Sequence, residues 1–223
     1  MKIGINLVGV SYNDGTYGRY RNYEDAIEGF MSNVVTPLRE DGHEIKFYIY
    51  SYDNIKRYDI LKAYEPVAKF EFIHPTYNGM GGGDVLPNGM KAISEAYISS
   101  LFQLLYEDLD LVISTRFDIN FLKNPFKEYQ FDFTKFNFLW REPEYLNLPI
   151  VNDTFVVFPH SMLDNVIDSI KEMEFNPPHG VNVAMHNWYL PMVNQVGEDN
   201  VKWVCDDYLT ASNNDLYKLM RHG

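Results

Sequence analysis

LDLVISTRFDINF, from Leu109 to Phe121, is the segment that decides the fold. It opens with an apolar, β-branched run that is typical of a buried strand, and Arg116, Asp118 and Asn120 follow directly. Side chains two residues apart on a strand point to the same side, so we expect these three polar groups on one face. A buried strand that ends in arginine and aspartate indicates a ligand site at its carboxyl end.

Strands and helices alternate around this segment. The expected strands are residues 2–10, 43–53, 68–75, 109–121, 136–140, 153–158 and 201–205. The expected helices are residues 23–40, 54–64, 90–107, 161–173 and 181–195. This alternation predicts an α/β fold in which helices flank a mostly parallel central sheet. Ligands on such sheets bind at the carboxyl ends of the strands.

The composition narrows the classes of function. The formal charge is −12, which disfavours binding to nucleic acid. Cys205 is the one cysteine, so an internal disulfide is excluded and a reducing compartment is expected. No apolar run is long enough for a membrane span, and the first residues resemble a strand more than a signal peptide. We therefore expect a cytoplasmic protein.

Asp118 and Asn120 form half of a site for a hard cation. Carboxylate and amide oxygens are the ligands that such ions prefer. A cation at this position could bridge the two phosphates of a nucleotide and neutralise a departing diphosphate. The alternative is that Asp118 caps the turn that follows the strand.

A longer block around this segment resembles a known family. Residues 88–121, NGMKAISEAYISSLFQLLYEDLDLVISTRFDINF, are similar to the core of GT-A-type glycosyltransferases of bacteria and large DNA viruses. There a helix leads into an apolar strand that ends in R-x-D-x-x-F, which Arg116, Asp118 and Phe121 match. Asn120 replaces the second acidic residue of the metal motif. The resemblance implies a GT-A-like (Rossmann-like) fold and transfer of a sugar from a nucleotide-diphosphate donor, most commonly a UDP-sugar, to a hydroxyl acceptor such as a glycan.

Two other segments extend the resemblance over most of the chain. The region of Arg19 and Arg21 is similar to the family's first strand-helix unit, which continues into a strand that ends near Tyr52 and Asp53. Residues Asn152–Phe155 resemble its later acidic motif. One domain, residues 1–223, is then expected, with a nucleotide-donor half (1–121) and an acceptor-side half (122–223).

By this resemblance, the exits of the first two strands hold the base and ribose, and an arginine pairs with a phosphate. The expected donor-binding residues are Val10, Ser11, Arg19, Tyr52, Asp53, Arg116 and Asp118.

The resemblance also implies the catalytic groups. Asp153 is the expected catalytic base, which removes the proton of the acceptor hydroxyl. A Mn²⁺ or Mg²⁺ ion is expected to assist departure of the diphosphate. Its expected ligands are Asp118, Asn120 and His179, with His186, Asp206 and Asp207 as alternatives for the third.

Three other functions stay open. A phosphohydrolase of the haloacid-dehalogenase type needs an aspartate at the end of the first strand, where this chain has Gly9-Val10-Ser11. A non-catalytic carbohydrate- or nucleotide-binding module suits the acidic, aromatic-rich composition but leaves the arginine and aspartate at the strand end unexplained. A degenerate transferase that binds a nucleotide without turnover fits the replacement at Asn120.

Overall fold

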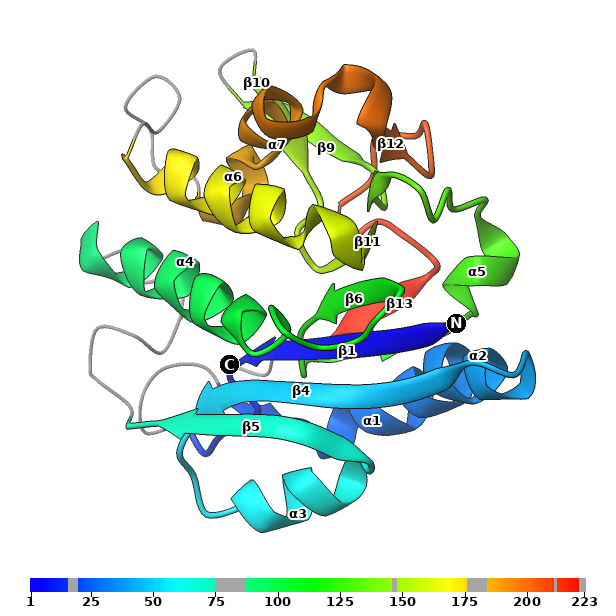
Figure 1. Ribbon diagram of the computed structural model, residues 1–223. Helices are drawn as coiled ribbons and strands as arrows, with labels where there is room; N and C mark the ends of the chain where they lie inside the picture. Colours follow the sequence, from blue (N-terminus) through cyan, green and yellow to red (C-terminus); the bar gives the residue numbers. More distant parts are fainter. Residues whose placement is uncertain (16–19, 75–86, 146–147, 176–183, 211, 221–223) are drawn as a thin grey trace.

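A seven-stranded sheet forms the centre of the molecule, with helices on both of its faces (Figure 1). The computed structural model describes residues 1–15, 20–74, 87–145, 148–175, 184–210 and 212–220. The order of strands is β12-β8-β11-β6-β1-β4-β5. These strands are β1 (Lys2–Gly9), β4 (Glu44–Tyr52), β5 (Val67–Ile73), β6 (Leu111–Thr115), β8 (Phe136–Phe138), β11 (Phe155–Pro159) and β12 (Val201–Trp203). The expected α/β fold with a mostly parallel central sheet is confirmed.

The helices cover the two faces of the sheet in separate groups. One face carries α1 (Glu24–Phe30), a π-helix (Met31–Val35), α2 (Thr36–Glu40) and α3 (Arg57–Ala63). The other carries α4 (Pro87–Phe102), α6 (Leu163–Phe175) and α7 (Tyr189–Val196). The helix expected over residues 23–40 is thus present, with a wider π turn in its middle.

Smaller elements connect these layers. The short strands are β2 (Tyr12–Asn13), β3 (Arg21–Asn22), β7 (Ile119–Phe121), β9 (Arg141–Tyr145), β10 (Leu148–Val151) and β13 (Tyr217–Leu219). The short helices are α5 (Pro125–Glu128) and three 3-10 turns, His160–Met162, Ala184–Asn187 and Glu198–Asn200. The sequence did not predict β9, β10 or β13, and these elements help to build the candidate site.

The strand pattern explains the two layers of core. On β1, Ile3, Ile5 and Leu7 are buried against α1–α3. The alternate side of the strand faces α4, where a Cβ on Gly4 would come within 2.6 Å of the Leu109 side chain. Glycine leaves room there for the Leu109 and Leu104 side chains, so the turns after α4 pack closely on the sheet.

One edge of the sheet gathers the ends of strands from both halves of the chain. Strands β5, β4, β1 and β6 are parallel, and β11 runs antiparallel to β6, with Phe155 opposite Thr115. The carboxyl ends of the four parallel strands therefore lie beside the start of β11. Residues 1–121 supply these four parallel strands, and residues 122–223 supply β11, β8 and β12.

The segment from residue 109 to residue 121 is not one strand, and this corrects the sequence prediction. Strand β6 ends at Thr115, a turn follows at Phe117 and Asp118, and β7 then pairs antiparallel with β13 in a separate sheet. The backbone amide of Met220 donates to the Asp118 carbonyl at 2.8 Å. Because of this turn, the predicted strand spacing from Arg116 through Asp118 to Asn120 is wrong.

Candidate functional site

Most of the predicted site residues lie along the carboxyl edge of three neighbouring strands. Val10 and Ser11 follow β1, Tyr52 and Asp53 end β4, and the Arg116 turn follows β6. Since β4, β1 and β6 are adjacent and parallel, these exits lie side by side. Arg19 and His179, which the sequence assigned to phosphate and metal, fall outside the described residues.

Arg116, Asp118 and Arg21 form an ion cluster in the turn after β6. Arg116 donates from Nε to Asp118 Oδ1 at 2.9 Å and from Nη2 to Oδ2 at 2.5 Å, and Arg21 Nε lies 3.5 Å from the same Oδ2. The Asp118 side chain is only 4% exposed, whereas that of Arg116 is 23% exposed. Burial lowers the pKa of Arg116, but Asp118 and Asp153 outweigh it, so the pKa is raised and the guanidinium stays charged.

The exits of β1 and β4 are tied together by hydrogen bonds. The Ser11 and Ser51 hydroxyls are 2.7 Å apart, and Asn54 Nδ2 donates to Ser11 Oγ at 3.2 Å. Burial raises the pKa of Tyr52 to about 12, so its phenol stays neutral. Asp53, by contrast, is half exposed and pairs with Arg57 at 3.1 Å. The side chains of Ser11 and Tyr52 are therefore buried at the edge of the sheet. Val10 and Asp53 are the more accessible of the four predicted residues.

A pocket of about 570 Å³ opens next to the Arg116 turn. Arg116, Glu142, Asp153 and His186 line it, and its volume falls in the usual range for small-molecule sites. Asp153 reaches the pocket because β11 is antiparallel to β6, which places the residues before Phe155 beside the end of β6. The structure thus brings the predicted catalytic Asp153 next to the predicted donor-binding Arg116.

Two carboxylates in the pocket act on His186. Asp153 raises the pKa of His186 most strongly, burial opposes this, and Glu142 adds to the increase. The His186 Nδ1 atom lies 3.3 Å from Glu142 Oε2 and 3.1 Å from the Val151 carbonyl oxygen. Burial in turn raises the pKa of Glu142, which His186 and Asn152 partly offset. Glu142 is therefore held by neighbours, and sequence patterns gave no indication of its place in the site.

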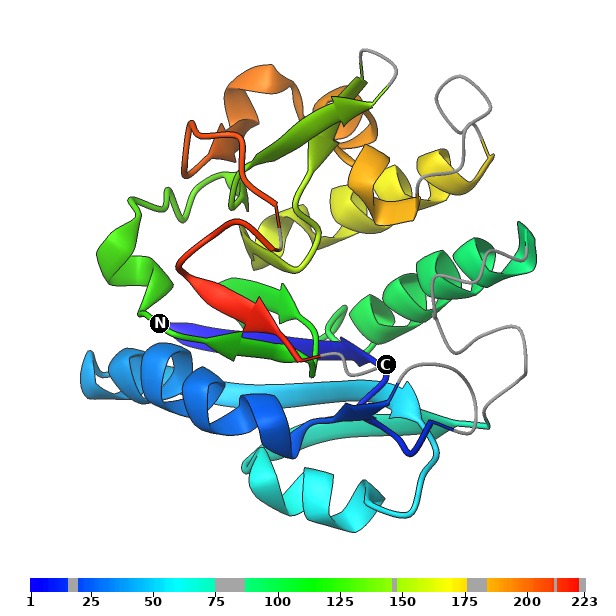
Figure 2. The ribbon, with the colours of Figure 1, turned by 180° about the vertical axis from the view of Figure 1, so that it is seen from behind.

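The C-terminal segment forms the opposite wall of the pocket. Figure 2 shows this segment, in orange and red, passing from β12 to β13. The wall consists of Thr210, Ser212, Asn214, Tyr217, Lys218, Leu219 and Met220. None of these residues was predicted, because a short strand with no long apolar run carries little local signal.

A closed ring of hydrogen bonds anchors this wall beside Asp153. Asn152 Nδ2 donates to the Tyr217 hydroxyl at 2.9 Å, and the hydroxyls of Tyr217 and Thr154 are also 2.9 Å apart. Thr154 Oγ1 donates to Asn152 Oδ1 at 2.6 Å, so Tyr217 supplies the proton of the remaining bond. The two residues that flank Asp153 are thus both fixed to β13.

Asp118 and Asn120, the two predicted metal ligands within the described part of the chain, do not come together. Both Asp118 oxygens accept from Arg116, while the Asn120 amide lies directly against Gly29 of α1, where an added Cβ would meet its Oδ1 at 1.9 Å. Among the described residues, no group of three His, Cys, Asp or Glu side chains is arranged to hold a metal ion. Asp206 and Asp207 are exposed beyond β12. This arrangement does not fit a cation shared by Asp118 and Asn120.

Similarity to known proteins does not identify the site. No protein-family model matches the chain, and no curated protein matches its sequence. In the part of the chain that the structure describes, no helix combines the length and the apolar character needed to cross a membrane. The function is therefore inferred from the chemistry of the pocket.

Proposed function

We propose that this protein is a glycosyltransferase that moves a sugar from a nucleotide-diphosphate donor to a hydroxyl acceptor. The observation that carries the proposal is that Asp153 and Arg116 line one pocket at the carboxyl end of β6, where β11 begins. A transfer of this kind needs a base for the acceptor and a cationic group for the diphosphate. The pocket supplies both on neighbouring strands.

The fold supports the same proposal. Antiparallel β11 beside parallel β6 brings Asp153 next to the end of β6, which supports a carboxylate on the acceptor side facing the donor. Val10 and Asp53, at the exits of β1 and β4, remain the proposed contacts for the base and ribose of the donor. Together with the R-x-D-x-x-F resemblance, this arrangement favours a GT-A-like fold and a UDP-sugar as the donor to test first.

Asp153 is the better placed of the two carboxylates to act as the base. Within the described part of the chain its carboxylate has no hydrogen-bond or ion-pair partner, whereas Glu142 is bonded by Asn152 and His186. Asp153 would accept the proton of the acceptor hydroxyl while the oxygen of that hydroxyl bonds to the anomeric carbon of the donor sugar. The bond from that carbon to the phosphate oxygen breaks, and its electron pair leaves with the diphosphate beside Arg116.

The test is a transfer assay with a panel of nucleotide sugars and sugar acceptors, read as release of nucleoside diphosphate. Asp153→Asn should lower kcat by about 10²-fold or more, because a positioned base contributes roughly 10²–10⁴-fold. The KM for the donor should change little, since Asp153 acts on the acceptor. Asp164→Asn, at an exposed position at the start of α6, is the matched control and should behave as wild type.

Two results would contradict the proposal. Unchanged turnover in Asp153→Asn would remove Asp153 from the chemistry. Nucleotide or sugar binding without release of diphosphate from any donor would support the non-catalytic binding module instead.

A further inference from the structure

The members of the ion cluster, Arg116, Asp118 and Arg21, differ in whether they line the pocket. Arg116 lines the pocket, whereas Asp118 lies behind it and is not among the described lining residues. Arg21, whose side chain is 5% exposed, lies 3.5 Å from Asp118 and does not line the pocket either. A ligand in the pocket therefore meets the Arg116 guanidinium before it can reach the Asp118 carboxylate.

We propose that Arg116, oriented by Asp118, binds the diphosphate of the donor, and that this binding needs no divalent cation. The inference rests on the proposed function, because it assumes a nucleotide-diphosphate donor. Asp118 is then a positioning residue for Arg116, which differs from the metal-ligand role that the resemblance implies.

The donor geometry of Arg116 suits a phosphate. A guanidinium has five N–H donors, and the pairing with Asp118 uses one on Nε and one on Nη2. Three N–H donors remain for a ligand and other pocket groups. Guanidinium and phosphate form short, charge-assisted and often bidentate hydrogen bonds, and Asp118 fixes the plane of the fork before a ligand arrives.

The same cluster disfavours a cation on Asp118. A metal ion would have to displace two charge-assisted hydrogen bonds from an almost fully buried carboxylate. The two guanidinium groups of Arg21 and Arg116 already offset the single charge of the Asp118 carboxylate, so Asp118 itself offers little attraction to a cation. Asn120 offers no second oxygen beside Asp118, because its amide packs against Gly29.

The experiment measures the Kd of nucleoside diphosphates, beginning with UDP, by calorimetry in EDTA and in Mn²⁺. For wild type, the two Kd values should agree within about twofold. Arg116→Gln should weaken binding at least about tenfold in both buffers, as expected for loss of a charge-assisted contact. Asp118→Asn keeps the shape and one acceptor oxygen, so it should still bind in EDTA. Thermal unfolding checks that each variant is folded.

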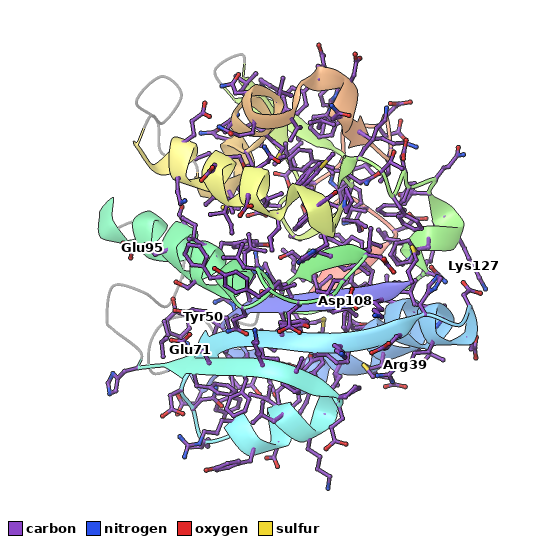
Figure 3. The ribbon with its side chains drawn as sticks, viewed as in Figure 1. Arg39, Tyr50, Glu71, Glu95, Asp108 and Lys127 are labelled. Atoms are coloured by element: carbon purple, nitrogen blue, oxygen red, sulfur yellow. The ribbon has the colours of Figure 1, made fainter. Side chains whose placement is uncertain are left out.

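Arg39→Gln is the matched control. Arg39 is exposed at the end of α2, on the side of the molecule opposite the arrowheads of β4 and β5 (Figure 3). It should leave the Kd unchanged, which separates a local contact from a general effect of charge.

The outcomes separate this inference from the proposed function. Wild-type binding that disappears in EDTA and returns with Mn²⁺, or wild-type affinity in Arg116→Gln, would overturn the role of Arg116 while leaving the transferase intact. No binding of any nucleoside diphosphate in either buffer would overturn the proposed function, and this inference with it.

Discussion

Arginine and aspartate are paired twice at the carboxyl edge of the sheet, and the two pairs differ in burial. After β6, Arg116 and Asp118 have side chains that are 23% and 4% exposed, and after β4, Arg57 and Asp53 are 44% and 42% exposed. The buried pair lies at a pocket with other charged groups, whereas the exposed pair lies along the start of α3. The same kind of ion pair can therefore contribute strongly to stability at one strand end and weakly at the next, because the burial differs.

The largest expected difference between the pairs is in stability. Asp118→Ala leaves Arg116 and the buried Arg21 without their shared carboxylate, so it should lower the free energy of unfolding by about 3–5 kcal/mol. Asp53→Ala removes an exposed partner of Arg57 and should cost less than about 1 kcal/mol. Urea unfolding of both variants measures the comparison. Similar losses in the two variants would show that burial of Asp118 is not what sets its contribution.

A smaller difference is expected for the tyrosines near each pair. Tyr217→Phe opens the hydrogen-bond ring and leaves the buried side chains of Asn152 and Thr154 with unmet bonds, at a cost of about 1–3 kcal/mol. Tyr58, which is 70% exposed, accepts from Arg57 at 3.1 Å, and Tyr58→Phe should change stability by less than about 0.5 kcal/mol. Thermal unfolding of the two variants tests this, and an equal shift would contradict the role of the ring.

The smallest expected effect is a pH dependence of stability, and it arises from His186, which lines the pocket beside the buried pair. Because Asp153 raises the pKa of His186 in the folded state, the protonated imidazole stabilises the fold. This contribution is fully present below the unfolded pKa of about 6.5 and is lost as pH rises through the higher folded pKa. His186→Gln should therefore destabilise the protein at low pH by less than about 1 kcal/mol, since the side chain is partly exposed.

Chemical unfolding of wild type and His186→Gln from about pH 5 to pH 9 measures the effect. The gap between the two proteins should narrow as pH rises. A gap that is constant or that widens with pH would contradict the electrostatic account.

Local patterns predicted the parts of the fold that depend on local burial. Alternating apolar residues such as Ile3, Ile5 and Leu7 predicted the central strands, and the polar residues at their ends marked the carboxyl edge of the sheet. The ends of the first two strands of the sheet, near Ser11 and Asp53, were also predicted, because each apolar run stops there. A parallel sheet then brings these strand ends together.

The parts that sequence patterns missed depend on contacts between distant segments. Nothing local indicated that β11 runs antiparallel to β6, and this pairing is what brings Asp153 to Arg116. Strand alternation placed Asp118 and Asn120 on one face, but the turn at residues 117–118 sends them to different neighbours. Glu142 reaches the pocket from β9, which gave no strand pattern.

The ring of Asn152, Thr154 and Tyr217 also bears on the order of folding. Its bonds to Tyr217 join residues 63 and 65 positions apart, and all three side chains must be held in place before the ring can close. We expect the ring to be largely absent from the folding transition state, so Tyr217→Phe should speed unfolding and barely slow refolding.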